Sequence, residues 1–278
     1  MLTCHVINLA DRPERLAHMA DQFARIGLPF ERIEAVDGRA LAARGLVHPL
    51  LTVGGLGCFH SHLAAMARIA AGDAPYGVVM EDDLWFTDAL GPLLADPSWI
   101  PAGADLIKLE TSLRPIQIGR RSRPIGDGIA LHRLWGRHMG GGAYVVARAT
   151  AARFATLDPM AATASIDALL FDPKVAPFPG LVRHQVVPAV AVQDIIVKDE
   201  ADLVFASDTD FDLAERRRRR AEARYRGVLG GLRRRSKGGR DRIKTWIDLA
   251  RRAISERTLD LQSRIVPVAP LPDERGGA

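Results

Sequence analysis

Apolar residues follow two different spacings along the first two hundred residues of the chain. Short, mainly apolar runs of strand length occupy residues 4–9, 30–36, 76–80, 105–109, 129–134 and 143–147. Between them, apolar residues recur at helical spacing, at residues 16–26, 59–71, 150–157 and 163–171. Strands that alternate with helices in this way are typical of an α/β fold with a mixed, mostly parallel sheet flanked by helices.

Two segments lack a clear pattern. Residues 39–56 are glycine-rich, and residues 110–128 are basic around Arg120 and Arg123. We expect irregular structure in both segments. The second is predicted to be a mobile loop that closes over a substrate.

The charge of the chain is unevenly distributed. The whole sequence carries 38 Lys and Arg against 33 Asp and Glu, a formal net charge of +5. Residues 214–257 hold 17 of the basic residues and 5 of the acidic ones, a local charge of +12, which leaves −7 on the remainder. We therefore predict an acidic body at residues 1–212 and a basic, amphipathic helical tail at residues 213–278.

The predicted tail combines five arginines at residues 216–220 with an apolar stripe that includes Trp246. Basic helices with such a stripe commonly lie on anionic membranes, although the stripe is equally suited to packing against the body. Aromatic residues are not interleaved with the arginines as a base-stacking platform requires, so nucleic acid is not the expected partner. The expected partner is an anionic membrane surface.

The composition, 47% hydrophobic and 26% charged over 278 residues, is that of a globular protein. No apolar run approaches the roughly 18 residues of a membrane span, and the first residues lack the basic start of a signal peptide. Cys4 and Cys58 are too few for the disulfide framework of a secreted domain, and both are interpreted as small buried hydrophobes. These features favour a cytoplasmic location, peripheral on the inner face of the cytoplasmic membrane if the tail binds lipid.

The most informative polar motif is the triplet Glu81, Asp82 and Asp83, which directly follows the strand predicted at residues 76–80. Ligands of open α/β sheets bind at the carboxyl ends of strands, and clustered carboxylates repel one another unless a cation holds them. The triplet therefore favours a divalent metal site for a phosphate-bearing substrate. Taken alone, it is equally consistent with a solvated strand end whose Asp residues cap a helix.

Ordered sequence blocks favour the first alternative. Residues 5–16 resemble the opening of glycosyltransferase family 25, which contains bacterial lipopolysaccharide galactosyltransferases and collagen galactosyltransferases. Gly57, Cys58, Ser61 and His62 match that family's Gly-Cys-x-x-Ser-His block. Further matching blocks follow the family's order, at residues 33–38, 79–83, 107–110 and 141–146. The similarity spans about residues 4–197.

This resemblance implies a GT-A fold, a nucleotide-sugar donor and an inverting transfer to a hydroxyl group, usually with a divalent metal such as Mn²⁺ or Mg²⁺. A cation on the pyrophosphate oxygens stabilises the charge that develops there as the glycosidic bond breaks. Asp83, the last acidic residue of the motif, is expected to bind the metal. Glu81 is assigned to the ribose or base side of the donor and Asp82 to a supporting role.

More donor-binding residues are expected at the same edge of the sheet. Asn8, at the end of the first strand, is expected to hydrogen bond a base, with Arg12 and Arg15 beside it, although Arg15 could equally be a surface charge. Backbone N–H groups at a helix start, a positive charge and a missing side chain all favour phosphate or sugar binding. The residues predicted on these grounds are Ser61, His62, Lys108 and Gly142.

Inversion requires a base that takes the proton of the acceptor hydroxyl. Asp167 is the candidate, because it lies in a stretch that resembles a family block with paired Asp residues. Residue 168 is Ala, so only the first of the pair is present. An ordinary polar position on a helix is the plain alternative, and Asp172, Glu110 and Asp194 are reserve candidates.

The sequence thus predicts an inverting glycosyltransferase that moves a hexose, galactose from UDP-galactose, to a saccharide acceptor in lipopolysaccharide or surface-glycan biosynthesis. The alternative is a non-catalytic nucleotide-sugar or glycan-binding protein that keeps the fold, since Gly55 and Ala168 depart from the family pattern. Zinc binding by Cys58, His60 and His62 is not expected, because residues two apart on a helix do not share a face.

Overall fold

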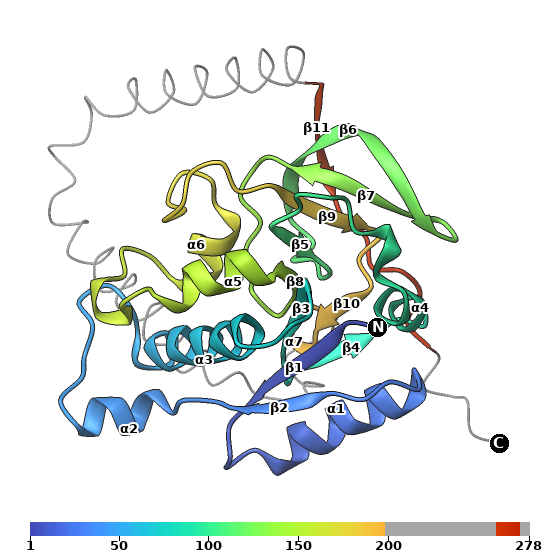
Figure 1. Cartoon of the computed structure of the whole chain (residues 1–278). Helices are drawn as coiled ribbons and strands as arrows, with labels where there is room; N and C mark the ends of the chain where they lie inside the picture. Colours follow the sequence, from blue (N-terminus) through green and yellow to red (C-terminus); the bar gives the residue numbers. More distant parts are fainter. Residues whose placement is uncertain (198–259, 273–278) are drawn as a thin grey trace, which may run out of the picture.

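The computed structural model describes residues 1–197 and 260–272 of the chain (Figure 1). Its helices are α1 (Pro13–Arg25), α2 (Gly38–Ala43), α3 (Val53–Ala70), α4 (Leu90–Ala95), α5 (Arg148–Ala155), α6 (Ile166–Phe171) and α7 (Asp194–Val197), with short 3₁₀ helices η1 (Pro97–Trp99) and η2 (Pro159–Ala161). Its strands are β1 (Thr3–Asn8), β2 (Glu31–Glu34), β3 (Tyr76–Glu81), β4 (Leu84–Phe86), β5 (Leu106–Lys108), β6 (Pro115–Gly126), β7 (Ile129–Leu134), β8 (Ala143–Ala147), β9 (Arg183–Val187), β10 (Ala191–Gln193) and β11 (Leu261–Ile265).

Nine of these strands form one mixed sheet in the order β11-β6-β7-β9-β5-β8-β3-β1-β2. The pairs β1–β2, β1–β3 and β5–β9 are parallel, and the other neighbours are antiparallel. The expected α/β class, a mixed sheet flanked by helices, is confirmed. The expectation that the sheet is mostly parallel is wrong, because five of its eight strand pairs are antiparallel. Antiparallel pairs are more numerous than the alternation indicated, because β8 inserts between β3 and β5 and a hairpin extends the sheet beyond β9.

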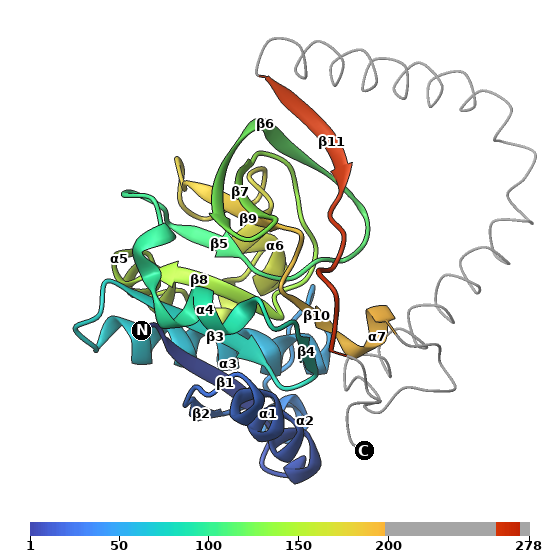
Figure 2. The same ribbon diagram turned by 90° about the vertical axis from the view of Figure 1, so that its right-hand side faces the viewer.

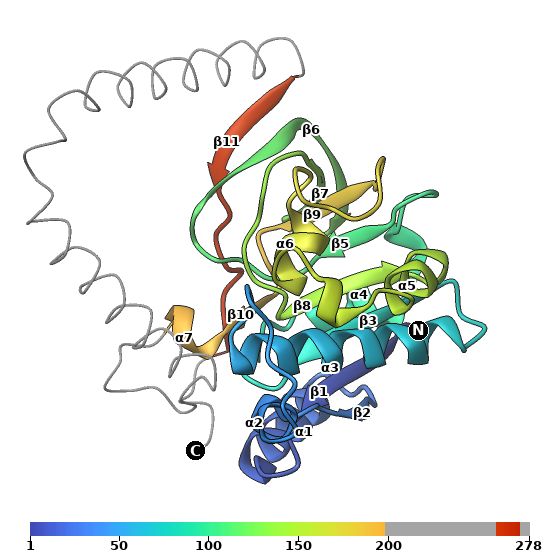
Figure 3. The same cartoon turned by 90° about the vertical axis from the view of Figure 1, so that its left-hand side faces the viewer.

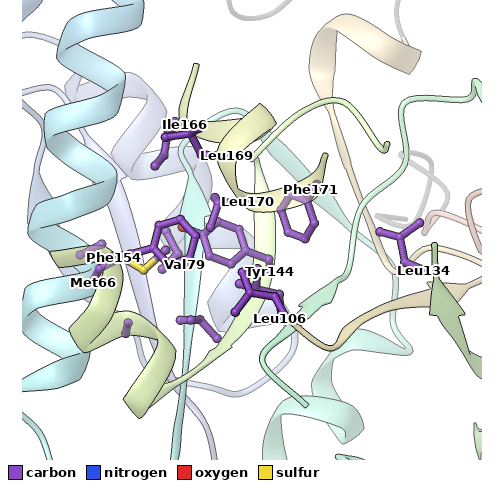
Figure 4. Packing of buried hydrophobic residues seen from close by; sticks show 14 of the residues in the cluster. Met66, Val79, Leu106, Leu134, Tyr144, Phe154, Ile166, Leu169, Leu170 and Phe171 are labelled. Atoms are coloured by element: carbon purple, nitrogen blue, oxygen red, sulfur yellow. The ribbon is translucent and has the colours of Figure 1, made fainter. Parts of the chain in front are cut away.

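Helices cover both faces of the sheet, with α3, α5 and α6 on one face and α1 and α4 on the other (Figures 1 and 3). Alternate residues of β3 divide between the two cores. Val78 and Met80 pack with α1 and α4, whereas Val79 packs with α3, α5 and α6. Figure 4 shows this second core, in which Tyr144 of β8 lies between Val79 and Phe171. Because β3 continues the same alternation, Glu81 faces α3.

The basic segment predicted as a mobile loop is instead largely a strand, β6, so that prediction is wrong. β6 pairs with β7 through a hairpin whose turn contains Gly128 at φ +66°, a conformation that glycine adopts without steric cost. Arg120 and Arg123 are exposed on it. Their charges therefore obscured a strand whose turn signal, Asp127 followed by Gly128, was present in the sequence.

The irregular structure expected at residues 39–56 is also partly wrong, because α2 spans residues 38–43 and α3 begins at Val53. The Asp37 side chain accepts a hydrogen bond from the Arg39 N–H, and Thr52 caps α3 in the same way through the Gly55 N–H. Each helix thus begins at a side-chain cap. The glycines concealed these helices because glycine lowers helix propensity.

The end of the chain returns to the body as a strand. β11 pairs antiparallel with β6 and forms the outermost strand of the sheet (Figure 2). Residues 261–265 are therefore extended and paired, and the helical tail predicted at 213–278 is wrong for this part. The rest of the predicted tail up to residue 259 lies outside the described residues, and the boundary at residue 212 stays a prediction. Within the described residues, none of the helices has the length and apolarity needed to cross a membrane.

Candidate functional site

Residues of the N-terminal βα unit fix the carboxylate of Asp82. Asn8 Nδ2 donates a hydrogen bond of 2.8 Å to one oxygen of Asp82, and Arg15 Nη1 donates one of 2.9 Å to the other. Arg15 is buried and not a surface charge. Burial raises the pKa of Asp82, and the charge of Arg15 opposes that shift. The side chains of Asn8 and Arg15, both predicted donor ligands, thus hold the end of β3 in place.

The Asp83 carboxyl group is also buried, but its side-chain hydrogen bonding is weaker than that of Asp82. Gln193 Nε2 lies 3.4 Å from its Oδ1. Burial raises the pKa of Asp83 to about 8, the charges of Glu81 and Asp82 add to the shift, and Arg15 opposes it. A divalent cation would replace the proton and reverse this effect. The oxygen ligand and its environment fit a hard cation such as Mn²⁺ or Mg²⁺.

Glu81 connects β3 to two other parts of the site. Its main-chain N–H donates to the Gly142 carbonyl at 2.8 Å. One carboxylate oxygen lies 3.3 Å from His62 Nε2 on α3, and the other accepts a hydrogen bond of 2.7 Å from Gln193 Nε2. The Glu81 side chain is 26% exposed, so it is held in position and still reachable from outside.

His62 is completely buried, and both of its ring nitrogens have partners. Nδ1 lies 2.9 Å from the hydroxyl oxygen of Tyr144, and the two rings stack with their centroids 5.8 Å apart. The Tyr144 hydroxyl is able to donate to this nitrogen or accept from it. The orientation of the imidazole is therefore set from β8, and Nε2 is directed at Glu81.

Cys58 lies one turn before His62 on the same face of α3, beside Glu81 of β3. Its Sγ is 3.9 Å from Glu81 Oε1. Burial raises the pKa of the Cys58 thiol well above 9.0, and the charges of Glu81, Asp167 and Asp83 raise it further. These four residues come from α3, β3 and its exit, and α6.

Contacts join the predicted metal ligand to the predicted base. Gln193 contacts both Glu81 and Asp83. Gly141 lies against both His62 and Asp167.

A buried ion pair supports the glycine segment at residues 140–142. Lys108 Nζ donates to Glu110 Oε1 at 3.0 Å and also contacts the Gly140 carbonyl. The same Glu110 oxygen accepts the Gly142 N–H at 2.7 Å. Any side chain at position 142 would collide with this carboxylate, since a Cβ atom there would lie 2.7 Å from Glu110 Oε2. Lys108 is fully buried and also lies over the Phe171 ring, so it holds the loop in place.

Asp167, in the first turn of α6, faces this glycine segment. Its Oδ2 accepts a hydrogen bond of 3.2 Å from the Gly140 N–H. A Cβ atom at Gly141 would lie 3.6 Å from Asp167 Cβ and 3.5 Å from His62 Cε1. These are ordinary van der Waals distances, so position 141 lies in contact with both α3 and α6. Asp167 is partly exposed, as a base that meets an incoming hydroxyl must be.

The three reserve candidates for the base are more deeply buried and are used by the protein. Glu110 is 2% exposed and paired with Lys108. Asp172 is 8% exposed and accepts a main-chain N–H two residues later at 3.0 Å. Asp194 is fully buried and accepts a hydrogen bond of 2.7 Å from Trp85 Nε1. The geometry therefore favours Asp167 over each of them.

Two other predicted donor residues have local partners. Ser61 is buried, donates to the Gly57 carbonyl at 2.7 Å and accepts the Val36 N–H at 2.8 Å, so it joins α3 to the segment after β2. Arg12 is half-buried, with Nη1 3.1 Å from the Asp11 carboxylate. Donor binding by these residues stays a prediction.

Sequence reasoning missed Gln193 and Tyr144. Gln193 contacts both Glu81 and Asp83 from β10, which is more than a hundred residues away in sequence. No local pattern marks such a residue. Tyr144 lies within the matched block at residues 141–146, and a hydroxyl in an otherwise apolar strand was the signal that could have identified it.

Comparison with known proteins assigns the family. A model of glycosyltransferase family 25, described as LPS biosynthesis proteins, matches residues 1–168, which is more than half of the chain. The chain belongs to glycosyltransferase family 25.

Similar curated proteins carry related names. The lacto-N-neotetraose biosynthesis glycosyltransferase LgtB of Neisseria meningitidis serogroup B is 31% identical over 172 residues, 56% of this chain and 62% of LgtB. LgtE of Neisseria gonorrhoeae is 28% identical over 78% of this chain and 83% of its own length. An inactive glycosyltransferase 25 family member 3 of Mus musculus is 34% identical over 30% of this chain and 17% of its own length.

Among solved structures, the mannose-1-phosphate geranyltransferase of Thermus thermophilus is 13% identical and covers 68% of this chain and 75% of its own, with a TM-score of 0.36. A likeness at this level says nothing about function.

The hydrogen bonds that Asn8 and Arg15 donate to the Asp82 carboxylate, here called the Asp82 clamp, lead to a testable prediction about stability. Replacing Arg15 with Met leaves a buried carboxylate without its cation, which should lower the free energy of unfolding by about 3–5 kcal/mol. Combining Arg15→Met with Asp82→Asn removes the uncompensated charge and should recover most of the loss. Urea unfolding of both variants measures this. Arg39→Met, which breaks only exposed pairs with Asp37 and Asp11, is the control and should have a much smaller effect. If Arg15→Met alone lowers the free energy of unfolding no more than Arg39→Met does, the proposed role of Arg15 is wrong.

Proposed function

We propose that this protein is an inverting glycosyltransferase that transfers a hexose to a saccharide acceptor of a bacterial surface glycolipid. The hexose is galactose, and its donor is UDP-galactose. Membership of glycosyltransferase family 25 supports the reaction class. The names of the Neisseria relatives support a saccharide acceptor in surface-glycan biosynthesis. The observation that carries the proposal is a series of contacts between the two residues. It runs from Asp83 through Gln193, Glu81 and His62 to Gly141, which lies against Asp167.

Asp83 is the proposed ligand of a divalent metal, Mn²⁺ or Mg²⁺. When bound, such a cation would neutralise the charge that develops on the diphosphate leaving group. Asp82 is a poor second ligand, because its two oxygens are already bound by Asn8 and Arg15. The protein thus keeps one carboxylate of the triplet as an anchor and directs its neighbour to the metal.

Asp167 is the proposed base. Its Oδ2 is held by the Gly140 N–H, which leaves Oδ1 to accept the proton of the acceptor hydroxyl as that oxygen attacks the anomeric carbon. A group with this role contributes roughly 10²–10⁴-fold to the rate. Glu81 is 26% exposed, and in this proposal it contacts the donor directly. Gly142 is buried and supports donor binding through its main-chain hydrogen bonds to Glu110 and Glu81. Asn8, Arg15, Ser61 and Lys108 support donor binding by fixing the strand ends and the glycine segment.

The predicted membrane contact is also part of the proposal. The basic stretch at residues 214–257 would hold the enzyme at the inner face of the cytoplasmic membrane, where a lipid-linked acceptor is presented. Its local charge of +12 supports this location. The stretch lies outside the described residues, so sequence alone supports this part.

Two variants separate binding from transfer. Asp83→Asn should abolish Mn²⁺-dependent binding of UDP-galactose, because the metal loses its carboxylate ligand. Asp167→Asn should leave that binding unchanged and lower kcat by about 10²–10⁴-fold, because only proton removal is affected. Calorimetric titration of the donor and a product assay with a panel of saccharide-terminated glycolipid acceptors give the two readouts. Asp172→Asn, at the other end of the same helix, is the matched control and should keep transfer.

Other outcomes would redirect the assignment. Loss of transfer in Asp172→Asn, with activity retained in Asp167→Asn, would make Asp167 an ordinary helix residue. Metal-dependent donor binding without transfer to any acceptor, in the unaltered protein, would favour the non-catalytic binding protein.

Vesicle binding tests the membrane contact. Replacing the five arginines at residues 216–220 with Gln should weaken binding to phosphatidylserine vesicles by on the order of 100-fold or more, because each basic residue near an anionic surface contributes about 1 kcal/mol. Sedimentation with vesicles at several salt concentrations measures this. The control replaces Arg120, Arg121 and Arg123, which are exposed on β6, and should bind as the parent does. Equal affinity of parent and five-arginine variant would rule out this contact.

A further inference from the structure

Three side chains at the interface of α3 and β3 place different metal-binding atoms around one point. They are Cys58, His62 and Glu81, whose ligand atoms all lie within 4.8 Å of one another. His62 Nε2 is 3.3 Å and Cys58 Sγ is 3.9 Å from the same oxygen of Glu81. Around a tetrahedral zinc ion, with bonds of about 2.0–2.3 Å, ligand atoms lie roughly 3.3–3.7 Å apart. The two distances to Glu81 are close to these values, and a shared cation requires Cys58 and His62 to approach each other by up to about 1 Å.

The spacing on α3 explains why these residues meet. Cys58 and His62 are four residues apart and lie on the same face of the helix. His60, between them, does not belong to the group. Burial lowers the pKa of His60, and the charge of Asp158 opposes that shift. Glu81, from the strand facing α3, takes the third position. The sequence argument against a Cys58, His60 and His62 site thus holds, but the topology supplies another ligand.

Neighbouring residues orient two of the three groups. The Tyr144 hydroxyl holds His62 Nδ1, which leaves Nε2 directed at the centre of the group. Gln193 Nε2 holds one oxygen of Glu81 at 2.7 Å, which leaves the other directed at the same centre. Residues that hydrogen bond to the metal ligands and orient them are typical of metal sites in proteins.

The electrostatic environment also favours a cation. Glu81, Asp83 and Asp167 all act on the Cys58 thiol. The buried cations Arg15 and Lys108 have other carboxylates as partners, Asp82 and Glu110 respectively. With its pKa raised to about 8, Asp83 holds its proton near neutral pH when no metal is bound, so the negative charge near Cys58 comes from Glu81 and Asp167. A bound divalent ion would offset this negative charge.

We propose that Cys58, His62 and Glu81 bind a thiophilic divalent cation of the zinc class, at a site distinct from the hard-metal site at Asp83. A thiolate and an imidazole favour Zn²⁺ or Co²⁺ over Mg²⁺ and Mn²⁺, which prefer oxygen ligands. Three protein ligands leave the fourth tetrahedral position to water or substrate, as in catalytic zinc sites. Since Glu81 is 26% exposed, that position is on the reachable side of the site. The proposal does not depend on the transfer reaction.

Binding exchanges protons in a balanced way. The Cys58 thiol loses one proton to solvent as its sulfur bonds to the cation. His62 binds through the lone pair of Nε2, so its proton must reside on Nδ1, which then donates to the Tyr144 oxygen. Glu81 binds as a carboxylate. No oxidant or reductant is required.

Cobalt titration of the full, untagged chain tests the site. Co²⁺ bound by a thiolate gives a sulfur-to-metal charge-transfer band in the near ultraviolet, and we expect this band to saturate at one Co²⁺ per chain and to disappear when Zn²⁺ is added. Cys58→Ser should remove the band, and Tyr144→Phe should weaken Co²⁺ binding by about 10–100-fold. Cys4→Ser is the matched control, because Cys4 is the other cysteine and lies buried in the opposite core, and it should keep the band.

Asp83→Asn separates the two metals. It should keep the cobalt band while losing Mn²⁺-dependent donor binding, so failure of the thiophilic site and failure of the proposed transfer are distinguishable. Absence of the band in the unaltered protein overturns the proposal even if a variant does not fold. A band that survives in folded Cys58→Ser, with circular dichroism like that of the parent, would overturn it as well.

Discussion

The hydrogen-bonded clamp on Asp82 is the constraint on which the rest of the site depends. Asn8 from β1 and Arg15 from α1 occupy both oxygens of a buried carboxylate at the exit of β3. Breaking such a pair leaves an unpaired buried charge, which is costly. Because Asp82 is held in this way, the positions of Glu81 and Asp83 on either side of it are fixed relative to the first βα unit.

The clamp divides three adjacent acidic residues into three roles. Glu81 continues the alternation of β3, faces α3 and meets His62 and Cys58. Asp83 lies beyond the strand near Gln193, in an environment suited to a hard cation. Two residues of sequence thus separate a carboxylate beside a thiol and an imidazole from a carboxylate beside the Gln193 amide. In the proposals made above, the one acidic triplet contributes to two chemically different metal sites.

Sequence patterns predicted the strands and helices of the first two hundred residues well, because periodicity reports which face of an element is buried. They also singled out Asp83, through the acidic motif at a strand end, and Asp167, through a family resemblance, and the roles of both stay predictions. They failed where pairing with a distant part of the chain determines the structure. One example is β6, whose exposed arginines conceal a strand, and the other is β11, which follows the basic stretch. Gln193 was missed for the same reason, since only the fold brings β10 to the triplet.

The central claim is that the acidic triplet binds a metal together with a nucleotide-sugar donor. Thermal unfolding of the full chain with UDP, GDP or CMP, each with and without Mn²⁺, tests it most directly. A ligand at 100 times its dissociation constant stabilises the folded state by about 2.7 kcal/mol, which raises Tm by roughly several degrees for a protein of this size. The account predicts a shift with UDP that requires Mn²⁺ and is lost in Asp83→Asn. No shift with any nucleotide, in either condition, would contradict it.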